Sequence, residues 1–149
     1  MSTVVIDGAY IAAGEGTEHS RGHIVAEDGI LTRVAAGPAP DIPRARRIDG
    51  RGCLATPGLV NTHNHLYQWA TQGMFADATL FEWLTGSYAL WSALDARTVF
   101  ETATAGTAWL ALSGCTTCSD HHYLFPREPA AMAAAEVEAA RAVGIRLHL

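Results

Sequence analysis

Cysteine, positive charge and long apolar runs are all scarce in this sequence of 149 residues. The three cysteines are odd in number and do not suit a disulfide framework, so we expect a cytoplasmic protein. Ten lysines and arginines stand against fifteen acidic residues, and the net charge of −5 leaves no basic surface for a nucleic-acid polymer. No stretch approaches the roughly 18 apolar residues of a membrane helix, and no signal peptide is recognisable, so no membrane partner is expected.

What the sequence does contain favours a compact fold. Hydrophobic residues make up 49% of the chain and charged residues 17%, which suits a protein with a real core. Residues 1–56 predict short strands separated by turns, including a tight hairpin at Glu27-Asp28-Gly29. We therefore expect a small β domain here, of the β-sandwich type, with His19 and His23 in contact with solvent.

Residues 57–149 predict a regular alternation of strands and helices. The expected order is a strand at 59–63, one or two helices within 79–94, a helix at 96–113 capped by Asp95, a strand at 115–119, a helix at 129–143 and a strand at 145–149. This βαβαβ order is typical of a parallel sheet with right-handed crossovers.

A three-stranded parallel sheet would leave an edge and part of one face uncovered. We therefore expect a truncated chain of the α/β class, in which residues 57–149 are the first three βα units of a (β/α)8 TIM barrel of about 250 residues. A complete small α/β domain is the alternative.

Two histidines end the first of these strands. His63 and His65 are separated by one residue, and side chains two apart on a strand point to the same face. Two imidazoles so placed can bind one metal ion, with Zn–N distances of about 2.0–2.1 Å. The carboxyl ends of barrel strands are also where active sites are built. A solvated pair on an exposed strand end is the alternative, but the buried strand before it favours a metal site.

The segments around these histidines resemble the amidohydrolase superfamily, and within it the branch of 8-oxoguanine deaminases, guanine deaminases and triazine hydrolases. The resemblance rests on a small β unit with Asp49 and Gly52 and on four stretches that follow it: Pro57-Gly58-Leu59-Val60-Asn61-Thr62-His63-Asn64-His65, Leu66-Tyr67-Gln68, Leu80-Phe81-Glu82-Trp83-Leu84 and Ser113-Gly114-Cys115-Thr116-Thr117-Cys118-Ser119-Asp120-His121-His122-Tyr123. It implies a β-sandwich domain made from both chain ends, and a tendency to form homo-oligomers.

The resemblance also implies that His63 and His65 are metal ligands from the first barrel strand. The remaining ligands of the family, and its proton-transferring glutamate and histidine, have no counterpart here. No catalytic residue beyond the two ligands is therefore expected in this chain.

The activity implied by the resemblance is hydrolytic deamination with one divalent metal, zinc first, with Fe²⁺ or Mn²⁺ as alternatives. A metal-activated hydroxide would attack the amine-bearing ring carbon of a purine-like heterocycle such as 8-oxoguanine or isoguanine. Chlorohydrolysis or aminohydrolysis of a triazine and deamination of a thioadenosine are alternative activities. A metal-free scaffold is the non-enzymatic alternative, which the ligand pair disfavours. The expected partners are therefore a small heterocycle and water.

Three further side chains are candidates for substrate contact. Gln68 lies three residues past His65, and its amide can donate to and accept from the edge of a heterocycle. Trp83 offers an aromatic face to a flat substrate. His122 follows the second strand, on the face that it would share with Asp120. Each has a plainer alternative: a solvated glutamine, a packing tryptophan and a loop histidine bonded to backbone.

Two other patterns are expected to be structural. Cys115 and Cys118 are three apart on a predicted strand, so they face opposite sides and cannot chelate one ion; we expect buried core thiols. Trp109 lies within the helix expected at 96–113 and is predicted to be in the core.

Overall fold

The computed structural model describes residues 2–149; Met1, the first residue of the expected β domain, lies outside them. The chain forms two compact units that divide between Pro57 and Gly58, and each unit has its own sheet. No helix among the described residues is both long and apolar enough to span a membrane.

The unit that ends at Pro57 is a five-stranded sheet. Its strands run in the order β3-β2-β1-β4, and β5 also pairs with β1. Strands β1, β2 and β3 are antiparallel neighbours, whereas β4 and β5 run parallel to β1. The bounds are β1 Thr3–Gly14, β2 Thr17–Glu27, β3 Ile30–Ala36, β4 Arg46–Asp49 and β5 Leu54–Ala55.

A two-residue turn joins β2 and β3, as the sequence predicts. Asp28 and Gly29 form it with positive φ angles of 48° and 83°. This is the backbone that a tight hairpin requires, and glycine adopts it without steric cost. The buried side chains of Val5, Ile11 and Val25 form a small apolar core for this unit.

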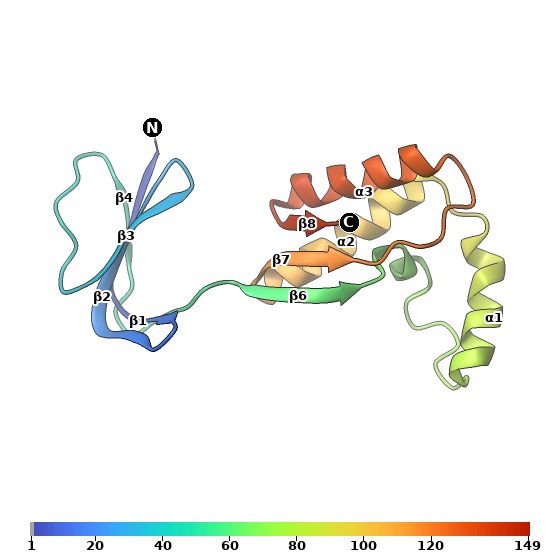
Figure 1. Cartoon of the computed structure of the whole chain (residues 1–149), viewed down its shortest axis with the longest axis horizontal. Coiled ribbons are helices and arrows are strands. Elements are labelled where there is room, and N and C mark those ends of the chain that lie inside the picture. The colour runs from blue at the N-terminus through green and yellow to red at the C-terminus, as the bar shows by residue number, and fades with distance from the viewer. Residues whose placement is uncertain (1) are drawn as a thin grey trace. The chain divides into compact units, whose positions relative to one another are not determined.

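The second unit, Gly58–Leu149, has the alternating order expected from the sequence. Its three strands form a parallel sheet in the order β6-β7-β8. Figure 1 shows helices α2 and α3 side by side along this sheet. The bounds are β6 Leu59–Asn64, the 3₁₀ helix η1 Leu66–Thr71, α1 Leu80–Trp91, α2 Ala96–Leu112, β7 Cys115–Asp120, α3 Pro129–Val143 and β8 Arg146–His148.

The helix ends follow from identifiable residues. The Asp95 side chain accepts a hydrogen bond from the Thr98 backbone N–H at 2.8 Å, which caps α2 as predicted. Pro129 occupies the first turn of α3, and Gly144 ends it with a φ of 88°. The end of α3 at Gly144 places the start of β8 shortly after it, at Arg146.

A cluster of buried side chains ties the segment after β6 to all three helices. Its members are Tyr67 of η1, Trp91 of α1, Leu94 before α2, Val99 of α2 and Met132 of α3. Because burying each large apolar side chain is worth about 1.5–3 kcal/mol, this cluster holds η1 and α1 in place beside the carboxyl end of β6.

Three expectations about burial are wrong. The strand before the histidine pair is not buried: Leu59 is 61% and Val60 63% exposed, because β6 is an edge strand of its sheet. His23 is only 3% exposed and its Nδ1 lies 3.0 Å from the Gly37 carbonyl oxygen, because strand alternation puts it on the same inner face as Val25. Trp109 is 65% exposed. It lies roughly 100° round the helix from the centre of the buried stripe of α2, which consists of Val99, Ala103, Gly106 and Thr107.

Candidate metal centre

The two histidines of the His-x-His pair lie close together at the carboxyl end of β6. His63 belongs to the strand and His65 follows its last residue, Asn64. Their ring centres are 5.0 Å apart and the planes are nearly perpendicular, at 85°. Two imidazoles that share a tetrahedral zinc at Zn–N distances of about 2.0–2.1 Å have centres roughly 5 Å apart. The observed separation therefore fits joint binding of one such ion.

A hydrogen bond to the backbone fixes the ring of His65. Its Nδ1 lies 2.9 Å from the carbonyl oxygen of His121. A carbonyl oxygen can only accept, so Nδ1 carries the proton and Nε2 keeps its lone pair. Metal-binding histidines commonly donate their second nitrogen to a carbonyl or carboxylate in this way. The donor set thus fits a divalent metal.

His121 is a neighbour of the pair that the sequence did not single out. Its ring centre lies 4.6 Å from that of His63, and its backbone N–H donates to the Asn64 carbonyl at 2.9 Å. The sequence carried no local signal for this contact, because it depends on the pairing of β6 with β7, which contains two register shifts. Asn64 is level with Asp120, and the residues that follow, His65 and His121, are joined by the hydrogen bond from His65 Nδ1 to the His121 carbonyl.

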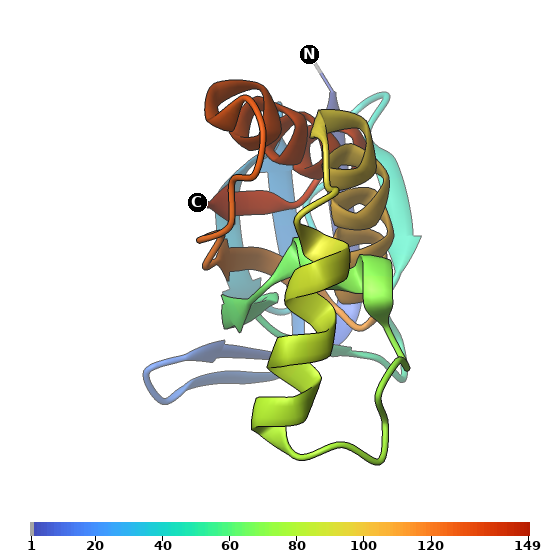
Figure 2. The same cartoon turned by 90° about the vertical axis from the view of Figure 1, so that its right-hand side faces the viewer.

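One pocket brings the histidine pair together with two of the three candidate substrate contacts. Gln68 comes from η1 and Trp83 from α1. Figure 2 looks onto the carboxyl ends of β6, β7 and β8, with η1 and α1 on the viewer's side. The pocket measures about 430 Å³ and is lined by His63, Asn64, His65, Gln68, Trp69, Thr71, Gln72, Gly73, Met74 and Trp83.

Two tyrosines lie beside the Gln68 amide. The amide nitrogen is 3.4 Å from the Tyr67 hydroxyl and 3.5 Å from the Tyr123 hydroxyl, at the long end of hydrogen bonding. Burial, followed by the hydrogen bond with Tyr123, raises the pKa of Tyr67. The Tyr67 phenol therefore stays neutral, and both hydroxyls lie beside the Gln68 amide.

His122, the third candidate, lies outside this pocket. Its side chain is fully buried, and its two ring nitrogens are 2.5 Å from a Glu136 carboxylate oxygen and 3.0 Å from the Leu124 carbonyl oxygen. Because β7 ends at Asp120, strand alternation no longer governs the following residues, and the ring turns toward α3. We therefore do not carry His122 forward as a substrate contact.

The two cysteines of β7 are buried, as the sequence predicts. Cys115 is 5% exposed and Cys118 fully buried. Burial is also the main cause that raises the pKa of Cys118, to about 11, so this side chain stays a protonated thiol. A thiol in that state packs as a small apolar group and is a poor metal ligand.

Comparisons with known proteins identify a family and several relatives of this chain. A sequence model of the Amidohydrolase family matches residues 54–149. The chain is 42% identical over 108 residues to the 8-oxoguanine deaminase of Pseudomonas aeruginosa, covering 70% of the chain and 24% of that protein. It is 33% identical over 156 residues to an isoxanthopterin deaminase from an unknown prokaryotic organism, covering 99% of the chain and 32% of that protein.

A solved structure gives the same result. A mutant of atrazine chlorohydrolase from Arthrobacter aurescens, complexed with zinc and atraton, matches with a TM-score of 0.88 and 29% identity, covering 97% of this chain and 34% of that one. The chain thus spans about a quarter to a third of the length of these relatives. The expected α/β class, the TIM-barrel relationship and the expected branch are confirmed. Because the family match covers most of its residues, the chain belongs to the amidohydrolase family.

Proposed function

We propose that this chain contributes the first-strand metal ligands and part of the substrate pocket of a metal-dependent hydrolytic deaminase. The substrate class is a purine-like heterocycle with an exocyclic amine, such as 8-oxoguanine or isoguanine. The observation that carries the proposal is the meeting of His63, His65, Gln68 and Trp83 on one pocket at the carboxyl end of β6. The similarity to 8-oxoguanine deaminase supports the choice of substrate.

In this proposal His63 and His65 hold the metal, His65 through Nε2 because its Nδ1 is bonded to His121. When bound, a divalent metal lowers the pKa of water to about 7 and so supplies the nucleophile for hydrolysis. Neutral imidazoles suit this chemistry because they leave the positive charge of the ion uncompensated. Zinc is the first candidate, since imidazole suits it and the matched atrazine chlorohydrolase was solved with zinc.

The substrate is held by groups of two kinds. The Gln68 amide can donate to and accept from the polar edge of the heterocycle. The Trp83 indole gives a planar ring a surface on which to stack. Together they would present the amine-bearing carbon to the histidine pair. Water adds at that carbon, the C–N bond breaks, and ammonia leaves as the carbonyl forms. We assign no proton-transferring side chain within residues 2–149.

Steady-state assays of the full-length protein test this activity. Ammonia release should be measured with 8-oxoguanine, isoguanine and guanine, before and after removal of metal by a chelator. We expect turnover of at least one purine, loss of turnover on chelation and its return on addition of zinc. Release of ammonia from none of the three purines by metal-loaded protein would reject the substrate class.

Hydrolysis of a triazine is the second candidate activity. It is favoured by the TM-score of 0.88 and the 29% identity to atrazine chlorohydrolase. The same assay with atrazine, following loss of chloride, separates the two activities. The non-enzymatic alternative predicts that the full-length protein purifies without bound metal and gains none on reconstitution.

We also propose residues 1–56 as a β domain and residues 57–149 as the first three βα units of the barrel. The division of the chain into compact units next to Pro57 supports this boundary. Limited proteolysis followed by mass spectrometry should find early cuts near residue 57. Early cuts inside α2 or α3, with the segment around residue 57 intact, would argue for a different boundary.

A further inference from the structure

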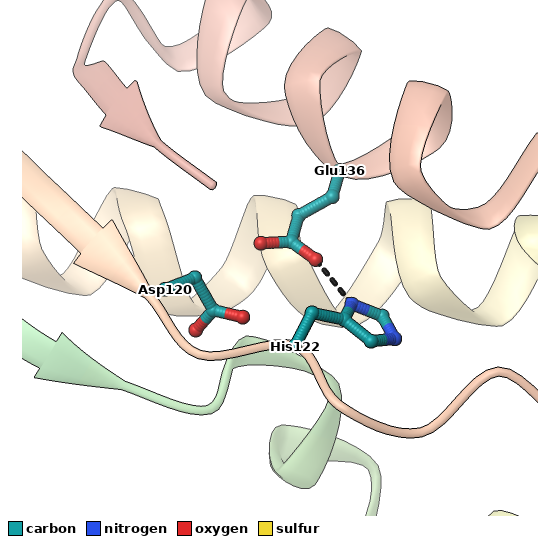
Figure 3. A group of neighbouring side chains, drawn as sticks. All are labelled: Asp120, His122 and Glu136. Atoms are coloured by element: carbon teal, nitrogen blue, oxygen red, sulfur yellow. Dashed lines mark hydrogen bonds and ion pairs between the residues drawn. The ribbon is translucent and has the colours of Figure 1, made fainter. Parts of the chain in front are cut away.

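Behind the candidate metal centre lies a buried polar network formed by Asp120, His122 and Glu136. Asp120 ends β7, His122 follows it, and Glu136 belongs to α3. Asp120 is 5% exposed, and the side chains of His122 and Glu136 are fully buried. Figure 3 shows the three side chains directed toward one another. Nothing in the proposed deamination uses them, and burying such polar groups is costly unless each finds a partner.

His122 is the cationic member of this network. Both of its ring nitrogens face acceptors, the Glu136 carboxylate and the Leu124 carbonyl, so both carry protons. Burial lowers the pKa of His122, but its hydrogen bonds with Glu136 and Leu124 and the neighbouring negative charge together raise it overall. An imidazolium has no lone pair for a metal. In this protonation state the network does not offer three free ligand atoms to a metal, although donor atoms of its three residues lie within 4.8 Å of one another.

Asp120 is the neutral member. Its Oδ1 accepts the Leu66 backbone N–H at 2.8 Å. Its Oδ2 and Oε1 of Glu136 are both buried without a hydrogen-bond partner, and side-chain donor atoms of the two residues lie within 4.8 Å of each other. A proton on Asp120 Oδ2 that is donated to Glu136 would give each of these two oxygens a partner. Burial, and then the charge of Glu136, raises the pKa of Asp120 to about 8, in agreement with this proton.

The network holds the backbone on both sides of the contact that orients His65. Residue His121 lies between Asp120 and His122, and its carbonyl accepts the His65 Nδ1–H. On the other strand, the Leu66 N–H that bonds to Asp120 belongs to the residue after His65. We propose that Asp120, His122 and Glu136 are positioning residues, which fix the His121 carbonyl and the His65 backbone so that Nε2 of His65 faces the metal.

This inference rests on the proposed function, because it presupposes a metal at the histidine pair. The positioning role makes a prediction that the proposed function alone does not make. A side chain of α3 with no contact to the metal should control metal affinity, and other buried side chains of the same helix should not. Loss of a hydrogen-bonded partner that supports a metal-binding histidine typically weakens metal binding 10- to 100-fold.

The matched pair of variants is Glu136→Ala and Met132→Ala in the full-length protein. Both residues are fully buried on α3, one turn apart, and both variants truncate the side chain to a methyl group. Zinc affinity is measured by competition with a chromophoric chelator, well below the unfolding temperature. We expect Glu136→Ala to weaken zinc binding about 10- to 100-fold. Met132→Ala should lower the Tm and leave zinc affinity within about threefold of wild type.

A second pair keeps the test decisive if Glu136→Ala does not fold. Asparagine in place of protonated Asp120 keeps an acceptor for Leu66 and a donor for Glu136, whereas alanine keeps neither. Asp120→Asn should therefore retain zinc affinity within about threefold, and Asp120→Ala should lose about 10- to 100-fold. In the cobalt-substituted protein, the visible spectrum should change for Asp120→Ala and not for Asp120→Asn.

Four results would overturn the inference, and the last of them would overturn the proposed function as well. Wild-type zinc affinity in Glu136→Ala and Asp120→Ala, in an enzyme that still deaminates, would remove the positioning role and leave the proposed function standing. Equal weakening by Met132→Ala would reduce the network to ordinary packing. Two zinc ions per chain, one of them lost in Glu136→Ala, would make the network itself a metal site. A wild-type protein that binds no zinc would instead reject the proposed function, and the inference with it.

Discussion

The ring of His63 stands edge-on to the ring of His65, with 5.0 Å between their centres. No hydrogen bond involves the ring nitrogens of His63 within residues 2–149, and His65 uses only Nδ1, so each ring keeps a nitrogen available. The pair lies at the end of β6, where the extended backbone turns into η1. This geometry is what a first-strand ligand pair requires, and it makes the metal the first property to test.

Replacing either histidine by asparagine should abolish metal binding. Each imidazole supplies one of few ligands, so its removal should cost more than the 10- to 100-fold loss caused by losing a supporting partner. We expect about one zinc per chain in the wild type and almost none in His63→Asn or His65→Asn, measured by elemental analysis after purification. His19→Asn, in the other unit, serves as control. Full zinc content in His65→Asn would contradict the ligand assignment.

Truncation of Gln68 should affect substrate binding and spare the metal. Loss of one neutral hydrogen bond costs about 0.5–1.5 kcal/mol, which corresponds to a rise in KM of about 2- to 10-fold. For Gln68→Ala we expect this rise in KM, with kcat and zinc content within about twofold of wild type. An unchanged KM would show that the amide does not contact the substrate.

The contribution of Trp83 can be separated from its packing. The centre of its ring lies 5.3 Å from the centre of the buried Trp91 ring. Trp83→Ala therefore removes this packing together with any stacking on the substrate. Trp83→Phe keeps an aromatic face, and aromatic pairs are worth about 0.5–1.5 kcal/mol. We expect KM to stay within about threefold in Trp83→Phe and to rise further in Trp83→Ala, while the Tm falls in both. Equal KM values in the two variants would remove Trp83 from the binding site.

Stability should fall as pH rises from about 4 to 8 because of Asp120. Its pKa is raised to about 8 in the folded state, chiefly by burial and then by Glu136, whereas an unfolded aspartate titrates near pH 3.9. Between these values the folded state holds a proton that the unfolded state has released, so raising the pH favours unfolding. Asp120→Asn cannot release a proton at this position.

Urea denaturation at pH 5 and at pH 8 measures this effect. The free energy of unfolding of Asp120→Asn, relative to that of the wild type, should therefore increase between the two pH values. A difference between variant and wild type that is the same at both pH values would mean that Asp120 is ionised in the folded protein.

Replacing Gly106 by alanine should destabilise the packing of α2 against η1, the 3₁₀ helix that lines the pocket. A Cβ there would lie 2.7 Å from a Leu66 methyl carbon and 2.8 Å from the Trp69 indole nitrogen. Overpacking costs about 1–3 kcal/mol, and the better helix propensity of alanine returns at most about 1 kcal/mol. We expect Gly106→Ala to lower the free energy of unfolding by about 1 kcal/mol. The exposed Ala105→Gln on the same helix should change it by less than about 0.5 kcal/mol.

The parts of the fold that could be predicted are those set by local chemistry. Pro129 and Gly144 bound α3 because one lacks a backbone N–H and the other adopts a positive φ, and Asp95 caps α2. The His63–His65 pair was visible because strand periodicity is two. Each of these signals lies within a few residues of the feature that it predicts.

The parts that could not be predicted depend on contacts between distant segments. Glu136 lies in an alanine-rich helix and resembles a solvated charge, until the fold brings it to His122. His121 gained its place beside His65 only through the alignment of two parallel strands. The prediction that Trp109 is buried was wrong for a related reason. Residue type alone did not indicate which face of α2 is covered by the rest of the unit.

The level alignment of Asn64 with Asp120 has a consequence for how this segment can vary over evolution. A residue added within Cys115–Asp120 would move a different carbonyl opposite His65 and draw Asp120 away from Leu66. A residue added after Leu124 would lengthen a surface connection and leave that alignment unchanged. Length variation among natural relatives should therefore collect between Leu124 and Pro129 and avoid the strand itself.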